Sequence, residues 1–157
     1  MKLKEIADII KGAYLIEGKS GKPIETCKEL TMVSLEPISF LDERKMISVN
    51  CSNEASEKQL TREGDVVVSL YQPMIACYVE KGQEGYVVPH YMAIVRKKPY
   101  VKMDSRFMVQ FINSPWGRRA LAEKLEKLSH YTPSSLPIKT LSQVELLAES
   151  NQILERY

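Results

Sequence analysis

The sequence predicts an α/β domain of the α+β type, in which a mixed, largely antiparallel sheet is flanked by helices. One observation is that three apolar runs rich in β-branched residues favour strands over helix: Val66–Leu70, Met74–Val79 and Met92–Val95. The other is that apolar residues beyond residue 103 recur at the spacing of amphipathic helices. Strands followed by helices, without regular alternation, are typical of α+β domains.

The strand predicted over Val66–Leu70 needs cover on both faces, because its valines are not separated by polar residues. Pro73 and the turn-forming segment Lys81–Gly85 separate the three runs. A short apolar run at Tyr86–Val88 adds a candidate fourth strand. Other segments of the chain must therefore pack on each side of this sheet.

The N-terminal segment predicts a short amphipathic helix that covers the sheet. Leu3, Ile6, Ile9 and Ile10 lie at helical spacing, and Gly12 is a typical helix stop. The glycines and serine of residues 17–22 predict an exposed loop.

The next segment predicts two short strands, Leu30–Leu35 and Met46–Val49, on either side of the polar connection Glu36–Lys45. Cys51–Leu60 is polar, and its composition is compatible with a loop or with one short helix. The sequence does not decide between the two.

Helices are predicted for the last third of the chain. Asp104 or Ser105 can cap a first helix, and Ser114 can cap a second that begins at Pro115. A polar loop over Ser129–Ser135 follows, and a final helix over Leu141–Tyr157 is expected to serve in packing or dimerisation.

Length and composition indicate one intracellular domain. A chain of 157 residues can bury about two-thirds of its unfolded surface. Three cysteines without a CxxC pair indicate neither a disulfide framework nor a zinc site. The first residues lack the apolar core of a signal peptide, and no apolar run is long enough to cross a bilayer. We expect a cytoplasmic protein without membrane contact, metal or cofactor.

The net charge of +2 hides an uneven distribution of charged residues. Residues 86–139 carry ten basic and three acidic side chains, whereas residues 1–85 carry eleven basic and fourteen acidic ones. If the basic side chains share one face they suit a polyanion, and otherwise they form a solvated surface.

Motifs for catalysis are scarce. The order of Cys51, Gly64-Asp65 and His90 resembles that of papain-like cell-wall peptidases, in which a histidine activates a cysteine thiolate. Such a nucleophile usually opens an apolar helix that lowers its pKa, but residues 51–59 are polar. A cysteine peptidase using Cys51 and His90 therefore stays an alternative.

Four short motifs, in order along the chain, carry a stronger likeness. They are L-x-E-I-A-x-I-I-x-G at Leu3–Gly12, a Gly-Asp strand at Gly64–Ser69, a helix ending in Asn-Ser at Phe107–Ser114, and a Leu-Pro segment running into a helix at Leu136–Tyr157. In this order and spacing the chain resembles the target recognition domain of the specificity subunits of type I restriction-modification systems.

The resemblance implies a DNA target recognition domain over residues 1–140 and the start of a spacer or dimerisation helix over residues 141–157. Such a domain recognises one half of a split double-stranded DNA target, performs no chemistry, and lies beside helices that dock methyltransferase subunits. For this chain it implies a homodimer or a partner-bound state. A second alternative is a partner-docking domain that has lost DNA binding.

Candidate DNA contacts fall into two classes. Loop residues with side-chain donors and acceptors are candidates for base contacts: Lys19, Ser20, Lys22, Gln72, His130, Tyr131, Thr132, Ser134 and Ser135. Basic residues of the 86–139 region are candidates for phosphate contacts: Arg96, Lys97, Lys98, Arg118 and Arg119.

Overall fold

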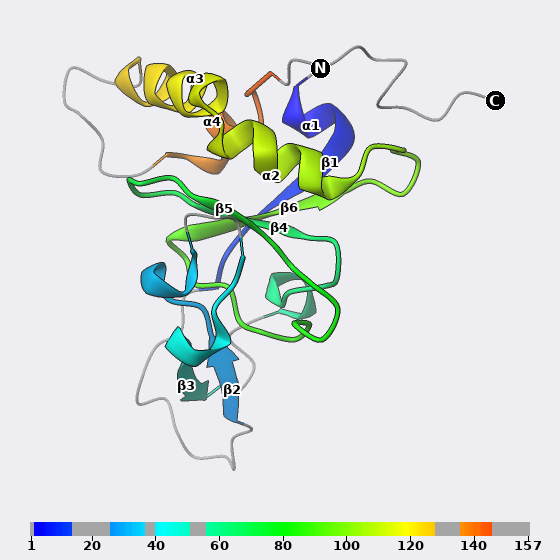
Figure 1. The fold of residues 1–157 in the computed structure, drawn as a ribbon, viewed down its shortest axis with the longest axis vertical. Helices are drawn as coiled ribbons and strands as arrows, with labels where there is room; N and C mark the ends of the chain where they lie inside the picture. Colours follow the sequence, from blue (N-terminus) through cyan, green and yellow to red (C-terminus); the bar gives the residue numbers. More distant parts are fainter. Residues whose placement is uncertain (1, 14–25, 37–39, 51–55, 128–135, 146–157) are drawn as a thin grey trace.

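The computed structural model describes residues 2–13, 26–36, 40–50, 56–127 and 136–145 (Figure 1). Its centre is a four-stranded sheet in the order β1-β6-β4-β5, and all neighbouring strands in it are antiparallel. The strands are β1 (Ala7–Lys11), β4 (Val66–Ser69), β5 (Ala76–Tyr78) and β6 (Met92–Lys97). The predicted fold class is confirmed, as are the three predicted strands of the 64–95 region.

Both faces of this sheet are buried, as the valine run predicted. Val66 and Val68 of β4 pack in a core on the helical side, whereas Val67 packs in a second core on the opposite side. Figure 1 shows the helices above the sheet and a lobe of short elements below it. Each side thus has its own hydrophobic core, with β4 and β6 shared between them.

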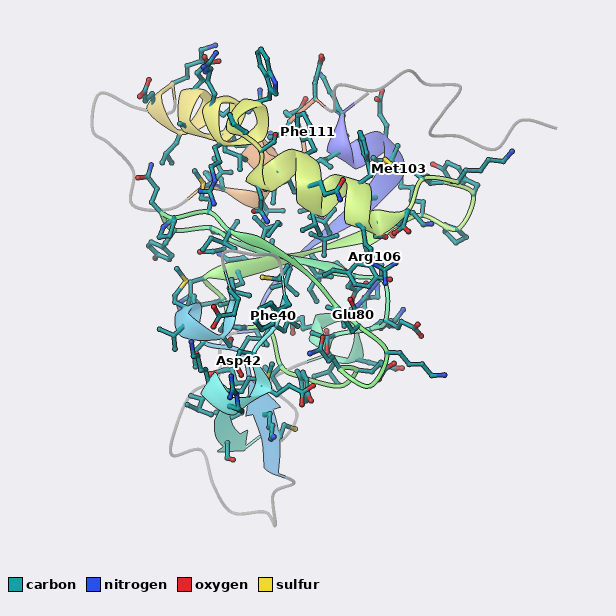
Figure 2. The ribbon with its side chains drawn as sticks, viewed as in Figure 1. Phe40, Asp42, Glu80, Met103, Arg106 and Phe111 are labelled. Carbon is teal, nitrogen blue, oxygen red and sulfur yellow. The ribbon has the colours of Figure 1, made fainter. Side chains whose placement is uncertain are left out.

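The helical layer consists mainly of α2 (Ser105–Asn113) and α3 (Pro115–Glu126), with the short α1 (Leu3–Ile6) beside them. Asp104 caps α2 and Ser114 caps α3, so both predicted helix starts are confirmed. Gly117 lets the two helices approach closely, because a Cβ there would lie 2.0 Å from the Phe111 carbonyl oxygen. Figure 2 shows Phe111 in this layer, and the ring is buried.

The predicted N-terminal helix is wrong beyond Ile6, because the chain continues as β1. A helix would place Ile9 and Ile10 on one side. The strand points them to opposite faces, where Ile9 packs with the helical-side core and Ile10 with the other. Gly12 directly follows β1, and a side chain is excluded there because a Cβ would lie 1.8 Å from the Pro89 carbonyl oxygen.

The lobe below the sheet contains β2 (Thr26–Glu29), which pairs antiparallel with β3 (Ile47–Asn50). The strand predicted near Met46–Val49 is confirmed in position. The one predicted over Leu30–Leu35 is wrong, because the strand ends at Glu29 and the 3-10 helix η1 (Met32–Ser34) follows.

Two further 3-10 helices occur in this part of the chain, η2 (Glu43–Lys45) and η3 (Glu57–Gln59). The predicted short strand at Tyr86–Val88 is replaced by isolated bridges from Val87 to Glu29 and to Leu60.

The C-terminal helix predicted over Leu141–Tyr157 is wrong at its start. The short α4 is Ile138–Leu141, and Glu145 then forms an antiparallel bridge with Lys2. Residues 146–157 lie outside the described residues, so the rest of that helix and the domain boundary at residue 140 stay predictions. Leu141 and Val144 are fully buried in the helical-side core.

The cysteines differ from expectation. Cys27 is disulfide-bonded, although the cysteine spacing indicated no disulfide. Cys77 of β5 is a buried free thiol.

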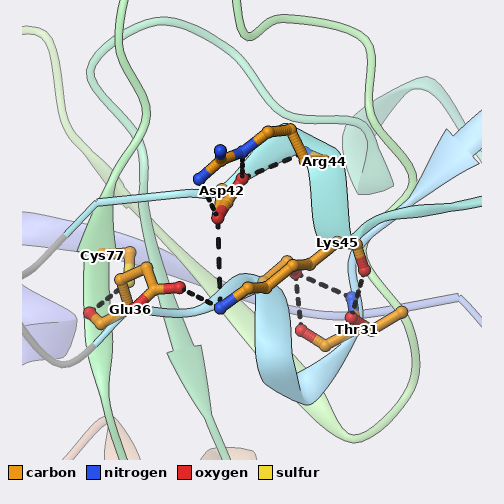
Figure 3. A network of polar contacts seen from close by, with 7 residues as sticks. Thr31, Glu36, Asp42, Arg44, Lys45 and Cys77 are labelled. Atoms are coloured by element: carbon orange, nitrogen blue, oxygen red, sulfur yellow. Dashed lines mark hydrogen bonds and ion pairs between the residues drawn. The ribbon is translucent and has the colours of Figure 1, made fainter.

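A polar network ties the lower lobe to the sheet (Figure 3). The Asp42 carboxylate accepts hydrogen bonds from the backbone N–H of Arg44 at 3.0 Å and from the Arg44 guanidinium at 3.0 and 3.1 Å. Lys45 Nζ lies 2.6 Å from Glu36 Oε1, and the Glu36 carbonyl accepts a weak hydrogen bond from Cys77 Sγ at 3.6 Å. The hydrogen bond from the Arg44 side chain is the main reason that the pKa of Asp42 lies below its ordinary value.

The Asn113 side chain fastens α2 to the edge of the sheet. Its Oδ1 accepts from the backbone N–H of Ala76 at 2.8 Å, and its Nδ2 donates to the Ala76 carbonyl at 2.8 Å. The amide thus pairs with the outer edge of β5 as a neighbouring strand would.

We expect Asn113→Ala to lower the free energy of unfolding by about 1–3 kcal/mol, because it leaves two buried backbone groups of Ala76 without partners. Urea denaturation measures this. Gln110→Ala, an exposed position on the same helix, is the matched control and should change stability by less than about 0.5 kcal/mol. Equal effects of the two substitutions would contradict the role given to Asn113.

We expect Asp42→Asn to destabilise the protein at neutral pH but not in acid. The pKa of Asp42 is lowered in the folded state, so its stabilising effect is present above the unfolded pKa and is lost as pH falls through the folded pKa. The free energies of unfolding of the two proteins should converge toward about pH 2. A difference that stays constant over that range would contradict this assignment.

Candidate nucleic-acid interface

The predicted DNA-contacting residues within the described chain separate into two groups at opposite ends of the central sheet. Gln72 lies in the turn between β4 and β5. Arg96 and Lys97 lie at the end of β6, beside the beginning of β4, where Val66 pairs with Val95. We call the segment Tyr71–Pro73 the hairpin tip. The residues around the two ends of the sheet differ in charge and exposure.

Beside the hairpin tip, the structure brings two of the predicted residues together. Gln72 and Pro73 of the tip, together with Arg118 and Leu121 of α3, line a cavity of about 190 Å³. Gln72 and Arg118 are both exposed. An amide that can pair with an adenine edge therefore lies near a guanidinium that suits a phosphate.

The outer surface of α3 carries the basic charge of this end. Arg118 and Arg119 are exposed, and within the described residues no carboxylate forms an ion pair with either one. Arg118 Nε donates to the Asn113 carbonyl at 3.3 Å, which orients it, and the Arg119 guanidinium lies 5.6 Å from the centre of the Trp116 ring. These two cations remain accessible to phosphates.

At the opposite end, Arg96 is engaged inside the protein. Its guanidinium donates to both carboxylate oxygens of Asp65, at 2.9 and 2.8 Å, and to the Leu60 carbonyl at 3.1 Å. The Asp65 side chain is 3% exposed and that of Arg96 is 14% exposed. This bidentate pair anchors the beginning of β4 to β6, and it explains the Gly-Asp start of the strand.

Other cations at this end are also balanced by acidic groups. The guanidinium of Arg106 lies 4.2 Å from the centre of the Tyr78 ring and 3.4 Å from carboxylate oxygens of both Glu80 and Asp104. Figure 2 shows Arg106 and Glu80 together at this end of the sheet. The pKa of Arg106 is raised, chiefly because Tyr78 carries a phenolate charge at the high pH at which a guanidinium titrates.

A polar cavity of about 540 Å³ lies here, and Lys97 and Lys102 line it along with Arg96 and Asp104. Lys97 and Lys98 are half-buried. Because acidic side chains lie among these cations, this end suits a polyanion less well than the arginines of α3.

Most of the predicted base-contacting residues lie outside the described residues: Lys19, Ser20, Lys22, His130, Tyr131, Thr132, Ser134 and Ser135. The first described residue after the predicted loop Ser129–Ser135 is Leu136, and its N–H donates to the Leu70 carbonyl at 2.8 Å. Leu136 therefore lies directly beside the hairpin tip.

Two polar residues beside the hairpin tip were not among the predicted DNA contacts. Lys11, placed in a helix by the sequence analysis, ends β1, and His90 precedes β6. Both line a second cavity beside Tyr71. Because β6 pairs antiparallel with β4, the residues before β6 lie at the same end of the sheet as those after β4. The sequence predicts no strand order, so it does not bring these residues together.

The described residues give little support to a catalytic cysteine. Cys51 lies outside the described residues, so its pairing with His90 stays untested. Cys77 is fully buried, and burial raises the pKa of its thiol to about 12. Within the described residues no group of histidine, cysteine, aspartate and glutamate is arranged to hold a metal ion, and no helix is long and apolar enough to cross a membrane.

This fold and surface define a small α+β domain with an exposed polar and basic end. No protein-family profile and no curated protein matches the chain. Several solved structures share its fold, including two that cover most of this chain. One, from work on complex assembly and conformational transition of the type I R-M system, has a TM-score of 0.65 at 10% identity over 92% of this chain and 36% of that one.

The other is the HsdS subunit of Thermoanaerobacter tengcongensis, with a TM-score of 0.59 at 14% identity over 92% of this chain and 31% of that chain. The present chain spans about a third of the length of each. The fold implied by the sequence resemblance is thus confirmed.

We expect the reduced protein to react with a thiol reagent near neutral pH at Cys27 and Cys51 with similar slow rates, and not at Cys77 until it unfolds. Mass spectrometry of the labelled peptides measures the three rates. Labelling of Cys51 that is much faster than labelling of Cys27 would instead support the peptidase alternative.

Proposed function

We propose that this domain recognises a specific double-stranded DNA sequence as the target recognition unit of a type I restriction-modification specificity subunit. The observation that carries the proposal is the fold shared, over 92% of the chain, with the HsdS subunit and with a chain from the type I R-M system. The four motifs in their order along the chain and the hairpin tip support it. In this proposal the protein itself catalyses no reaction.

The hairpin tip and α3 form the proposed contact surface. Arg118 and Arg119 bind phosphates and fix the position of the domain on the duplex, while Gln72 contacts a base edge in the major groove. The residues between Lys127 and Leu136 are further candidates for base contacts, since Leu136 pairs with Leu70 at the tip. Arg96 has a structural role instead, because its guanidinium is paired with Asp65.

A single domain of this size recognises one part of the target. We propose that a second copy, or a second domain of the same kind, supplies the other part, and that methyltransferase subunits dock on the assembly.

A partner-docking domain without DNA binding is the second candidate. Trp116 favours it, since this ring on α3 is 63% exposed and tryptophan is common at the centres of protein interfaces. The two candidates differ in their dependence on salt, because neutralised phosphates release counterions and protein contacts of Trp116 do not.

We expect binding to duplex DNA to weaken steeply as salt rises, and the double substitution Arg118→Ala and Arg119→Ala to lower the log-log slope by roughly two. Fluorescence anisotropy at several salt concentrations measures the slope. The matched control removes two exposed lysines elsewhere on the surface, Lys58→Ala and Lys81→Ala, and should leave the slope nearly unchanged.

Absence of DNA binding at low salt would contradict the proposed function. An equal loss of slope in the two double variants would contradict the interface on α3, because it would mean that only total charge matters.

A further inference from the structure

A second, smaller cavity of about 100 Å³ lies beside the hairpin tip, and it shares no lining residue with the cavity of Gln72 and Arg118. Its apolar lining includes Leu70, Leu136 and Ile138, and the rings of Tyr71 and Tyr91 contribute to its wall. Its polar lining consists of Lys11 and His90. We call this cavity the Tyr71 pocket.

The backbone around the Tyr71 pocket is held by a set of hydrogen bonds. Ser69 Oγ donates to the Tyr71 carbonyl at 2.8 Å and accepts from the Tyr71 N–H at 3.3 Å. The Leu70 N–H donates to the Tyr91 carbonyl at 3.0 Å, and the Leu70 carbonyl accepts from the Leu136 N–H at 2.8 Å. The tip therefore needs little ordering when a ligand binds.

The aromatic rings are also fixed relative to one another. Tyr91 lies edge to face with Tyr71, at 6.5 Å between ring centres, and with His90, at 5.4 Å. Tyr71 is nevertheless 37% exposed, and His90 is exposed at the rim. The pocket is thus a preformed depression whose lining is partly apolar and partly polar.

The chemistry of the lining matches one base edge in the major groove. Thymine presents its 5-methyl group beside the O4 acceptor, whereas guanine presents two acceptors and cytosine a donor. The apolar residues of the pocket suit the methyl group, and the ammonium of Lys11, which only donates, suits O4. Arg118, which lines the neighbouring cavity with Gln72, is available to hold the DNA backbone.

We propose that the Tyr71 pocket recognises a thymine of the DNA target through its 5-methyl group, with Lys11 as the donor to O4. This inference rests on the proposed function, and it assigns one element of sequence specificity to Tyr71, Lys11 and the pocket between them.

Single replacement of thymine by uracil tests the proposal, because it removes only the methyl group. The preferred sequence is first selected from a random duplex library with the full chain, and each thymine in it is then replaced by uracil. At one position the wild-type protein should bind about fourfold more weakly, the effect of losing one buried methyl group.

Tyr71→Ala should weaken binding to the thymine duplex and abolish the difference between thymine and uracil at that position. Tyr71→Phe keeps the ring and should retain the difference. Arg118→Ala is the control for a phosphate contact, and it should weaken binding to both duplexes while the thymine-to-uracil ratio stays the same.

The proposal is overturned if no thymine position distinguishes the two bases, or if Tyr71→Ala keeps the wild-type ratio. Either result leaves DNA binding itself intact, so it is distinct from failure of the proposed function, in which the wild-type chain binds no duplex at low salt.

Discussion

The burial of β4 on both faces is the constraint on which the structure depends. A strand of consecutive valines has no face for water, so a layer must pack on each side. The helices supply one layer, and the lobe of 3-10 helices and short strands supplies the other. Two polar anchors set the position of the sheet within these layers, namely the Asp65–Arg96 pair at one end and the Asn113 amide at the edge of β5.

The basic residues fall into two groups, those held in ion pairs within the protein and those exposed without an ion pair among the described residues. Arg96 belongs to the basic region of the sequence, but its guanidinium forms an ion pair with Asp65. Arg106 is likewise paired with Glu80 and Asp104. The arginines of α3 lie outside this ion-pairing. The basic side chains that are free of ion pairs within the described residues are therefore fewer than the distribution of charge along the chain indicates, and Arg118 and Arg119 are among them.

The hairpin tip combines rigidity with exposed side chains of different chemistry. Ser69 and the contacts of Leu70 hold its backbone, while Tyr71 and Gln72 face outward between two cavities. A surface of this kind suits recognition of base edges. A wrong base leaves the fixed donors and acceptors of the protein unpaired, whereas the right base forms hydrogen bonds with them. Trp116 on the neighbouring helix adds an apolar group that suits a protein partner.

The strands of the 64–95 region, the caps at Asp104 and Ser114, and the α+β class could be predicted from the sequence, because these features depend on local periodicity and capping. The sequence pattern misassigned β1, since Ile9 and Ile10 fit either period until two cores lie on opposite sides. The folded chain was needed to show that Arg96 is internal. It was also needed to show that Gln72, Arg118, Lys11 and His90 lie around one tip. Strand pairing brings these residues together over long sequence separations, and no local pattern encodes that pairing.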